Sequence, residues 1–135
     1  MSELGAQRHH ARERALELFY EATIKDRSVD AILSALNVMP DPYTVLLVRS
    51  AEEHRDVANE LISRFSQGWA LDRLALIDRL IMTLAIGELL TDTTPPAAVV
   101  LDEAVELAKA YSTDGSPAFV NGVLAACVAQ LEDNA

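Results

Sequence analysis

Apolar residues recur three and four positions apart along the whole chain, and no stretch alternates in the manner of a β-strand. Side chains at this spacing lie on one face of an α-helix. One such stripe runs through Leu47, Ala51, His54, Ala58 and Leu61. The pattern restricts the fold to the all-α class.

Start and stop signals divide the chain into six or seven helices. Ser28 and Asp41 can each accept a hydrogen bond from a free backbone N–H, and Pro42 suits a first helical turn. Prolines after Thr94 and Ser116 mark two further helix starts. We expect helices over about 7–25, 29–36, 42–67, 70–90 with one bend near its start, 95–111 and 116–131, the third of them ending at Gly68.

The size of the chain predicts a single domain over residues 1–135. Half of the residues are apolar, which is enough for a core without disulfides or metal. The apolar runs fall far short of the roughly 20 residues of a membrane span, so we expect no membrane contact and a cytoplasmic protein. The single cysteine, Cys127, agrees with a reducing compartment and is expected to be buried.

Positive charge is concentrated at the start of an acidic chain. Eleven basic and 21 acidic residues give a net charge of −10, so the overall field repels nucleic acid and any nucleic-acid site must be a local patch. Guanidinium groups bind phosphate and stack on bases, but a short solvated basic end is common on acidic proteins, and both interpretations stay open here. The cations of this segment are Arg8, His9, His10, Arg12 and Arg14.

The usual catalytic and metal-binding motifs are absent from the sequence. His9 and His10 are adjacent, and a helix directs adjacent side chains about 100° apart, which makes a poor metal site. His54 lies in an apolar stripe and is interpreted as an interior or rim residue. We therefore expect no enzyme activity, cofactor or metal.

Three segments of the sequence together resemble the NusB family of transcription antitermination factors. They are RHHARERALELFYEA, GWALDRLALIDRLIMTLAIGELL and PPAAVVLDEAVELAKAYSTDGSPAFVNGVLAA, and their order and spacing also match the family. The resemblance implies a compact bundle of about seven helices in two helical subdomains. It also implies binding of boxA RNA together with the ribosomal protein NusE, within the RNA polymerase antitermination complex.

The resemblance assigns RNA contacts to both ends of the chain. The arginine-rich start of the family falls on Arg8, His9, His10 and Arg12. Because two of these cations are histidines, we expect phosphate binding to strengthen as the pH falls toward 6.

A second set of RNA contacts is implied near the C-terminus. The family's RNA-contacting segment places Phe119 and Asn121 where a ring and an amide meet an unstacked base, although Phe119 equally suits a core position. Gly115 stands where the family can carry an acidic residue, with Asp114 beside it, so that contact is open.

For NusE, the resemblance implies a surface that includes Tyr20, Asp72 and Asp78, whose carboxylates suit a basic partner. The chain departs from the family in the middle segment, with Thr83 where an arginine is common and Gly87 where an aromatic residue is common. Glycine in a helix costs about 1 kcal/mol relative to alanine, and the sequence offers no reason for Gly87.

Two other functions compare less well with the sequence. RNA-methylating relatives of the family carry a large catalytic domain with a glycine-rich loop, which this chain of 135 residues lacks. A helical protein-interaction module or homodimer without RNA binding remains the alternative, since family members include both monomers and dimers.

Overall fold

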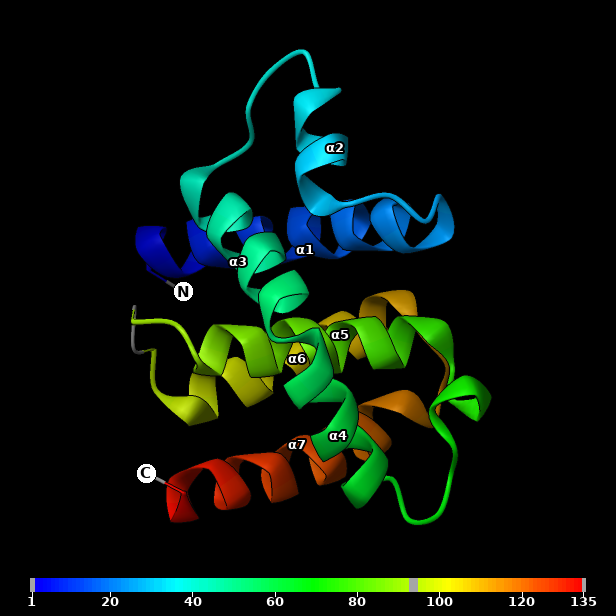
Figure 1. The fold of residues 1–135 in the computed structure, drawn as a ribbon. Coiled ribbons are helices and arrows are strands. Elements are labelled where there is room, and N and C mark those ends of the chain that lie inside the picture. The colour runs from blue at the N-terminus through cyan, green and yellow to red at the C-terminus, as the bar shows by residue number, and fades with distance from the viewer. Residues whose placement is uncertain (1, 93–94, 135) are drawn as a thin grey trace.

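The computed structural model describes residues 2–92 and 95–134, and this part of the chain is all α (Figure 1). It contains seven α-helices and one 3₁₀ turn, so the predicted fold class is confirmed. Thr94, predicted as a helix start, lies outside the described residues. The elements are α1 (Glu3–Ile24), α2 (Val29–Ser34), α3 (Pro42–Glu53), α4 (Arg55–Phe65), η1 (Leu71–Arg73), α5 (Leu76–Leu89), α6 (Ala97–Tyr111) and α7 (Ser116–Asp133).

The helices form two groups that share α5. Helices α1, α2 and α3 pack on one another, and α4, α6 and α7 surround α5 on the other side (Figure 1). Helix α5 also contacts α1 and α3, so it joins the two groups. This central position explains why α5 is apolar almost all the way round, with ten of its residues buried.

One hydrophobic core runs through both groups of helices. Phe19 of α1, Ile62 of α4, Ile86 of α5 and Leu124 of α7 are all fully buried in it. None of the helices in the described part combines the length and the apolar character that crossing a membrane requires.

Side chains cap the helices where the sequence predicted caps. The Ser28 hydroxyl accepts from the Ala31 N–H at 3.1 Å, and the Asp41 carboxylate accepts from the Tyr43 N–H at 2.7 Å. Helix α1 begins earlier than predicted, at Glu3, because Ser2 caps it through the N–H of Gly5 at 2.9 Å.

The prediction of a single helix from residue 42 to Gly68 is wrong, because the helix is interrupted at His54. The backbone there leaves the helical region, with φ −101° and ψ 19°, and α3 ends while α4 begins. The His54 ring bonds the Ser50 carbonyl oxygen through Nδ1 at 2.9 Å.

The bend predicted near the start of the next helix is instead η1 followed by an extended Leu74, so α5 begins only at Leu76.

The structure explains Gly87, for which the sequence offered no reason. A Cβ built on Gly87 would lie 2.9 Å from the backbone nitrogen of Ala51 and 3.0 Å from its Cα. At the same crossing the Ser50 hydroxyl donates to the Gly87 carbonyl at 2.8 Å. Glycine therefore allows α3 and α5 to approach backbone to backbone.

Candidate nucleic-acid interface

Arg8 lies at the start of α1 in a recess between α1 and α6. Its guanidinium carbon is 3.8 Å from the centroid of the Tyr43 ring, a stacked cation–π contact. The recess is about 340 Å³ in volume, and its lining also includes Leu4, Pro95 and Val99. No ion pair holds Arg8 within the part of the chain that the structure describes, so its N–H groups can reach a phosphate.

Arg12 does not lie on the surface with Arg8, contrary to the expectation of a shared exposed patch. It is only 6% exposed. Its Nε and terminal nitrogens donate to the Glu88 carboxylate at 2.9 and 2.6 Å, and the Tyr43 hydroxyl donates to the same carboxylate at 2.6 Å. The geometry makes Arg12 a structural residue that joins α1 to α5.

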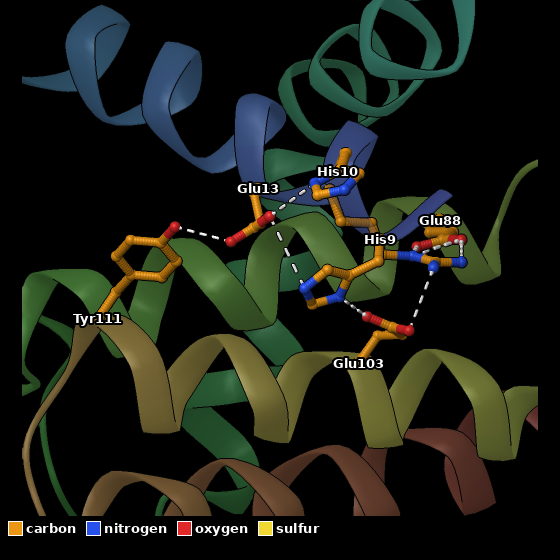
Figure 2. A network of polar contacts seen from close by, with 7 residues as sticks. His9, His10, Glu13, Glu88, Glu103 and Tyr111 are labelled. Carbon is orange, nitrogen blue, oxygen red and sulfur yellow. Dashed lines mark hydrogen bonds and ion pairs between the residues drawn. The ribbon is translucent and has the colours of Figure 1, made fainter. Parts of the chain in front are cut away.

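The two histidines are bound to carboxylates, as Figure 2 shows. Nδ1 of His9 lies 2.7 Å from Oε2 of Glu103 on α6, and Nε2 lies 3.7 Å from Oε1 of Glu13. Nδ1 of His10 lies 3.2 Å from the same Glu13 oxygen, although the His10 side chain is 78% exposed. The Tyr111 hydroxyl donates to the other oxygen of Glu13 at 2.8 Å and lowers the pKa of that carboxyl.

His9 should make the stability of the fold depend on pH. The hydrogen bond to Glu103 raises the pKa of His9 above its ordinary value of 6.5, against a smaller lowering by burial. Because the pKa of His9 is higher in the folded than in the unfolded chain, protonation of His9 stabilises the folded state. This stabilisation is fully present below pH 6.5 and is lost as the pH rises through the raised pKa.

We expect the free energy of unfolding, measured by urea titration, to fall over the pH range just above 6.5, and His9→Gln to flatten that part of the profile. The exposed His10 provides the control variant, His10→Gln, which should keep most of the native slope. An unchanged slope in His9→Gln would assign the pH dependence to other groups.

Carboxylates offset most of the positive charge at the start of α1. Arg12 pairs with Glu88, Arg14 with Glu17 at 3.0 Å, and His9 with Glu103. Arg8 alone among the arginines of this segment has no carboxylate partner in the described structure. The segment therefore presents a smaller excess of positive charge than its sequence indicates, which limits the number of phosphate contacts that it can make.

Phe119 and Asn121 belong to α7, a different helix from that of Arg8, and neither of them lines the recess that holds Arg8. Figure 1 shows α1 and α7 on opposite sides of α5. Asn121 is exposed, whereas Phe119 is half-buried, packs against the core and lines a groove with Arg64 and Phe65 of α4. The structure thus brings Arg8 together with His9 and His10, but it does not bring the α7 pair to them.

The three residues predicted to face NusE differ in exposure. Tyr20 is 41% exposed on α1, and Asp72 is exposed on η1. Asp78 is only 5% exposed, and its carboxylate accepts from the hydroxyls of Ser112 at 2.6 Å and Ser116 at 2.9 Å. Asp78 therefore holds the connection between α6 and α7 in place, and its carboxylate is occupied by hydrogen bonds within the chain.

Sequence reasoning missed Glu88, which organises the Arg12 contacts. Its signal was present: Glu88 is a carboxylate inside the apolar run IMTLAIGELL, and a buried carboxylate requires a partner. Tyr43 and Glu103 gave no such signal, because their roles depend on the approach of α3 and α6 to α1.

Metal binding and thiol chemistry were the two other possibilities that the sequence raised. Among the described residues, no three His, Cys, Asp or Glu side chains are grouped so that they could hold a metal ion. Cys127 is buried, and burial raises the pKa of its thiol to about 11, so the thiol stays protonated at neutral pH.

Comparisons with known proteins agree with the resemblance seen in the sequence. The NusB family profile matches residues 9–129. NusB of T. maritima is 31% identical, with 87% of each chain covered and a TM-score of 0.76. NusB of Aquifex aeolicus shares the fold at 24% identity, with 95% of this chain and 91% of that chain covered and a TM-score of 0.75.

A third similarity is to a chain of a crystal structure that contains the antitermination factors NusB and NusE with double-stranded RNA. The identity is 25%, the coverage is 88% of this chain and 93% of that chain, and the TM-score is 0.73. The family profile covers most of the chain, and the helices follow the same course as those of a NusB protein with 31% identity. The chain therefore belongs to the NusB family.

Proposed function

We propose that this chain is a transcription antitermination factor that binds boxA RNA together with NusE and acts on elongating RNA polymerase as part of the antitermination complex. The observation that carries the proposal is the family match over residues 9–129, combined with the similarity to a NusB, NusE and RNA complex along 88% of the chain.

Arg8 supports an RNA contact at the start of α1. Its guanidinium stacks on Tyr43 and has no carboxylate partner among the described residues, so its donors are oriented and available. We further propose that the exposed His10 and the half-buried His9 lie beside this contact. Arg12 would contribute indirectly, by holding α1 against α5 through Glu88. Phe119 and Asn121 would form a second contact on α7.

The binding of a labelled boxA RNA, followed by fluorescence anisotropy with and without NusE, tests this function. We expect NusE to strengthen binding, and we expect Arg8→Ala to weaken it and to reduce the slope of log K against log salt by about 1. Binding of the native chain should also strengthen as the pH falls toward 6 at fixed salt.

Arg14→Ala is the matched control, because Arg14 is on the same helix but already pairs with Glu17. It should change RNA affinity much less than Arg8→Ala. Equal losses in the two variants would show that only the total charge matters, and no RNA binding with or without NusE would leave a NusB-like protein with a different partner.

The surface of α1 provides the alternative, a homodimer without RNA binding. Leu4 is 57% exposed and Tyr20 is 41% exposed there. Sedimentation over a concentration series decides between the two, because a constant monomer mass would exclude the dimer.

A further inference from the structure

A recess between α1, α4 and α5 carries unpaired positive charge on an acidic protein. Six of the eleven Lys and Arg residues pair with carboxylates, which leaves Arg8, Arg27, Arg55, Arg73 and Arg79 without a carboxylate partner in the described part of the chain. Arg55 and Arg79 line the same cavity, of about 200 Å³. Two unpaired guanidinium groups at one cavity are unexpected at a net charge of −10.

Each of the three helices contributes residues four positions apart, which share one helix face. These pairs are Phe19 and Thr23 of α1, Arg55 and Asn59 of α4, and Arg79 and Thr83 of α5, with Leu80 completing the lining. Among the described residues, no carboxylate belongs to the lining. The recess therefore presents cations without the acidic neighbours that surround the start of α1.

The nitrogen donors of Arg55, Arg79 and Asn59 in this recess are available for a ligand, whereas the two threonine hydroxyls are not. The hydroxyls of Thr23 and Thr83 donate to the backbone carbonyls of Phe19 and Arg79, at 2.9 and 2.8 Å, so they have no hydrogen to offer. Neither the two guanidinium groups nor the Asn59 amide has an acceptor among the described residues. The Arg55 guanidinium carbon lies 5.0 Å from the centroid of the Phe19 ring, which restricts its orientation.

We propose that this recess is an anion site that binds a phosphate group. Two guanidinium groups and an amide match the oxygens of phosphate, and charge-assisted hydrogen bonds of this kind are the strong ones. The cavity is smaller than the roughly 300–1,000 Å³ of drug-sized ligands, so it fits a phosphate group better than a whole nucleotide.

This site is distinct from the RNA contact proposed at Arg8. Thr23 lies 15 residues after Arg8 on α1, which is roughly 22 Å along the helix axis. The phosphate group has two sources, a free phosphate ion or a nucleotide of a bound RNA, and the experiment separates them. The arm with free phosphate does not depend on the antitermination function.

The test is a titration of the full chain with inorganic phosphate at constant ionic strength, followed by NMR of the Arg55 and Arg79 guanidinium N–H groups and the Asn59 amide. We expect saturable shifts confined to these groups, and an affinity at least about tenfold lower in Arg79→Gln. Arg73→Gln is the matched control: it removes the same charge from an unpaired, exposed arginine outside the recess and should bind like the native chain.

A second titration uses boxA RNA with NusE. RNA as the source predicts shifts of the same three groups, weaker RNA binding in Arg79→Gln than in Arg73→Gln, and competition by phosphate. If free phosphate is the source, the RNA affinity should be the same with and without phosphate and the same in Arg79→Gln as in the native chain. The anion site is excluded if neither ligand shifts these groups saturably, or if Arg79→Gln and Arg73→Gln respond alike to both ligands. Thermal melting confirms that the variants fold.

Discussion

Replacing Arg12 with alanine should lower the free energy of unfolding by about 3–5 kcal/mol, the usual cost of removing one partner of a buried ion pair. The Arg12 and Glu88 side chains are 7% and 3% exposed, and their closest nitrogen and oxygen are 2.6 Å apart. Without Arg12, the Tyr43 hydroxyl would be the remaining strong donor to the Glu88 carboxylate among the described residues. Urea unfolding followed by circular dichroism measures the loss.

Arg14→Ala provides the control on the same helix. Arg14 pairs with Glu17 at 3.0 Å, but the two side chains are 43% and 58% exposed, so we expect a loss of less than about 1 kcal/mol. Similar losses for Arg12→Ala and Arg14→Ala would mean that the buried Arg12 pair contributes no more to the free energy of unfolding than the exposed Arg14 pair.

The double replacement Arg12→Met with Glu88→Leu separates the cost of a broken pair from the value of the intact pair. Removing both charges often leaves stability unchanged or increases it, so the double variant should be more stable than Arg12→Ala. This result matters for function, because loss of RNA binding in an Arg12 variant would report unfolding as well as lost contact. Arg8 is the residue that can test the contact itself.

Local sequence signals predicted much of the fold. The caps at Ser28 and Asp41 depend on residues within three positions, and both form as expected. The break at His54 could not be predicted in this way, because the apolar stripe continues across it with helical spacing. The spacing of apolar residues indicates which side chains are buried. The same spacing can continue where the helix axis changes direction, so it does not predict the break.

The candidate site depended more on long-range contacts, and the sequence predicted it less well. Sequence reasoning read Arg12 and Asp78 as surface charges, yet their partners lie 76 residues away at Glu88 and 34 and 38 residues away at Ser112 and Ser116. No local rule connects such residues. A charge inside an apolar stretch, as at Glu88, is the local sign that a distant partner exists.

Gly87→Ala should destabilise the chain by about 2 kcal/mol, although alanine is the better helix former. The new Cβ would lie 2.9 Å from the Ala51 backbone nitrogen, and backbone cannot rotate away as a side chain can. Overpacking of this kind costs about 1–3 kcal/mol and here falls at the upper end, which exceeds the gain in helix propensity of about 1 kcal/mol. An aromatic side chain at position 87 would require α3 and α5 to separate.

Gly122→Ala makes the same substitution in an open position. Gly122 lies inside α7, and no atom of another helix in the described structure comes within 4 Å of a Cβ built there. Only the propensity gain then applies, and stability should rise by up to about 1 kcal/mol. Urea titrations of the two variants should therefore shift in opposite directions from the native midpoint. If both shift upward, α3 and α5 can move apart at little cost, and the close approach at Gly87 does not determine how the two groups of helices join.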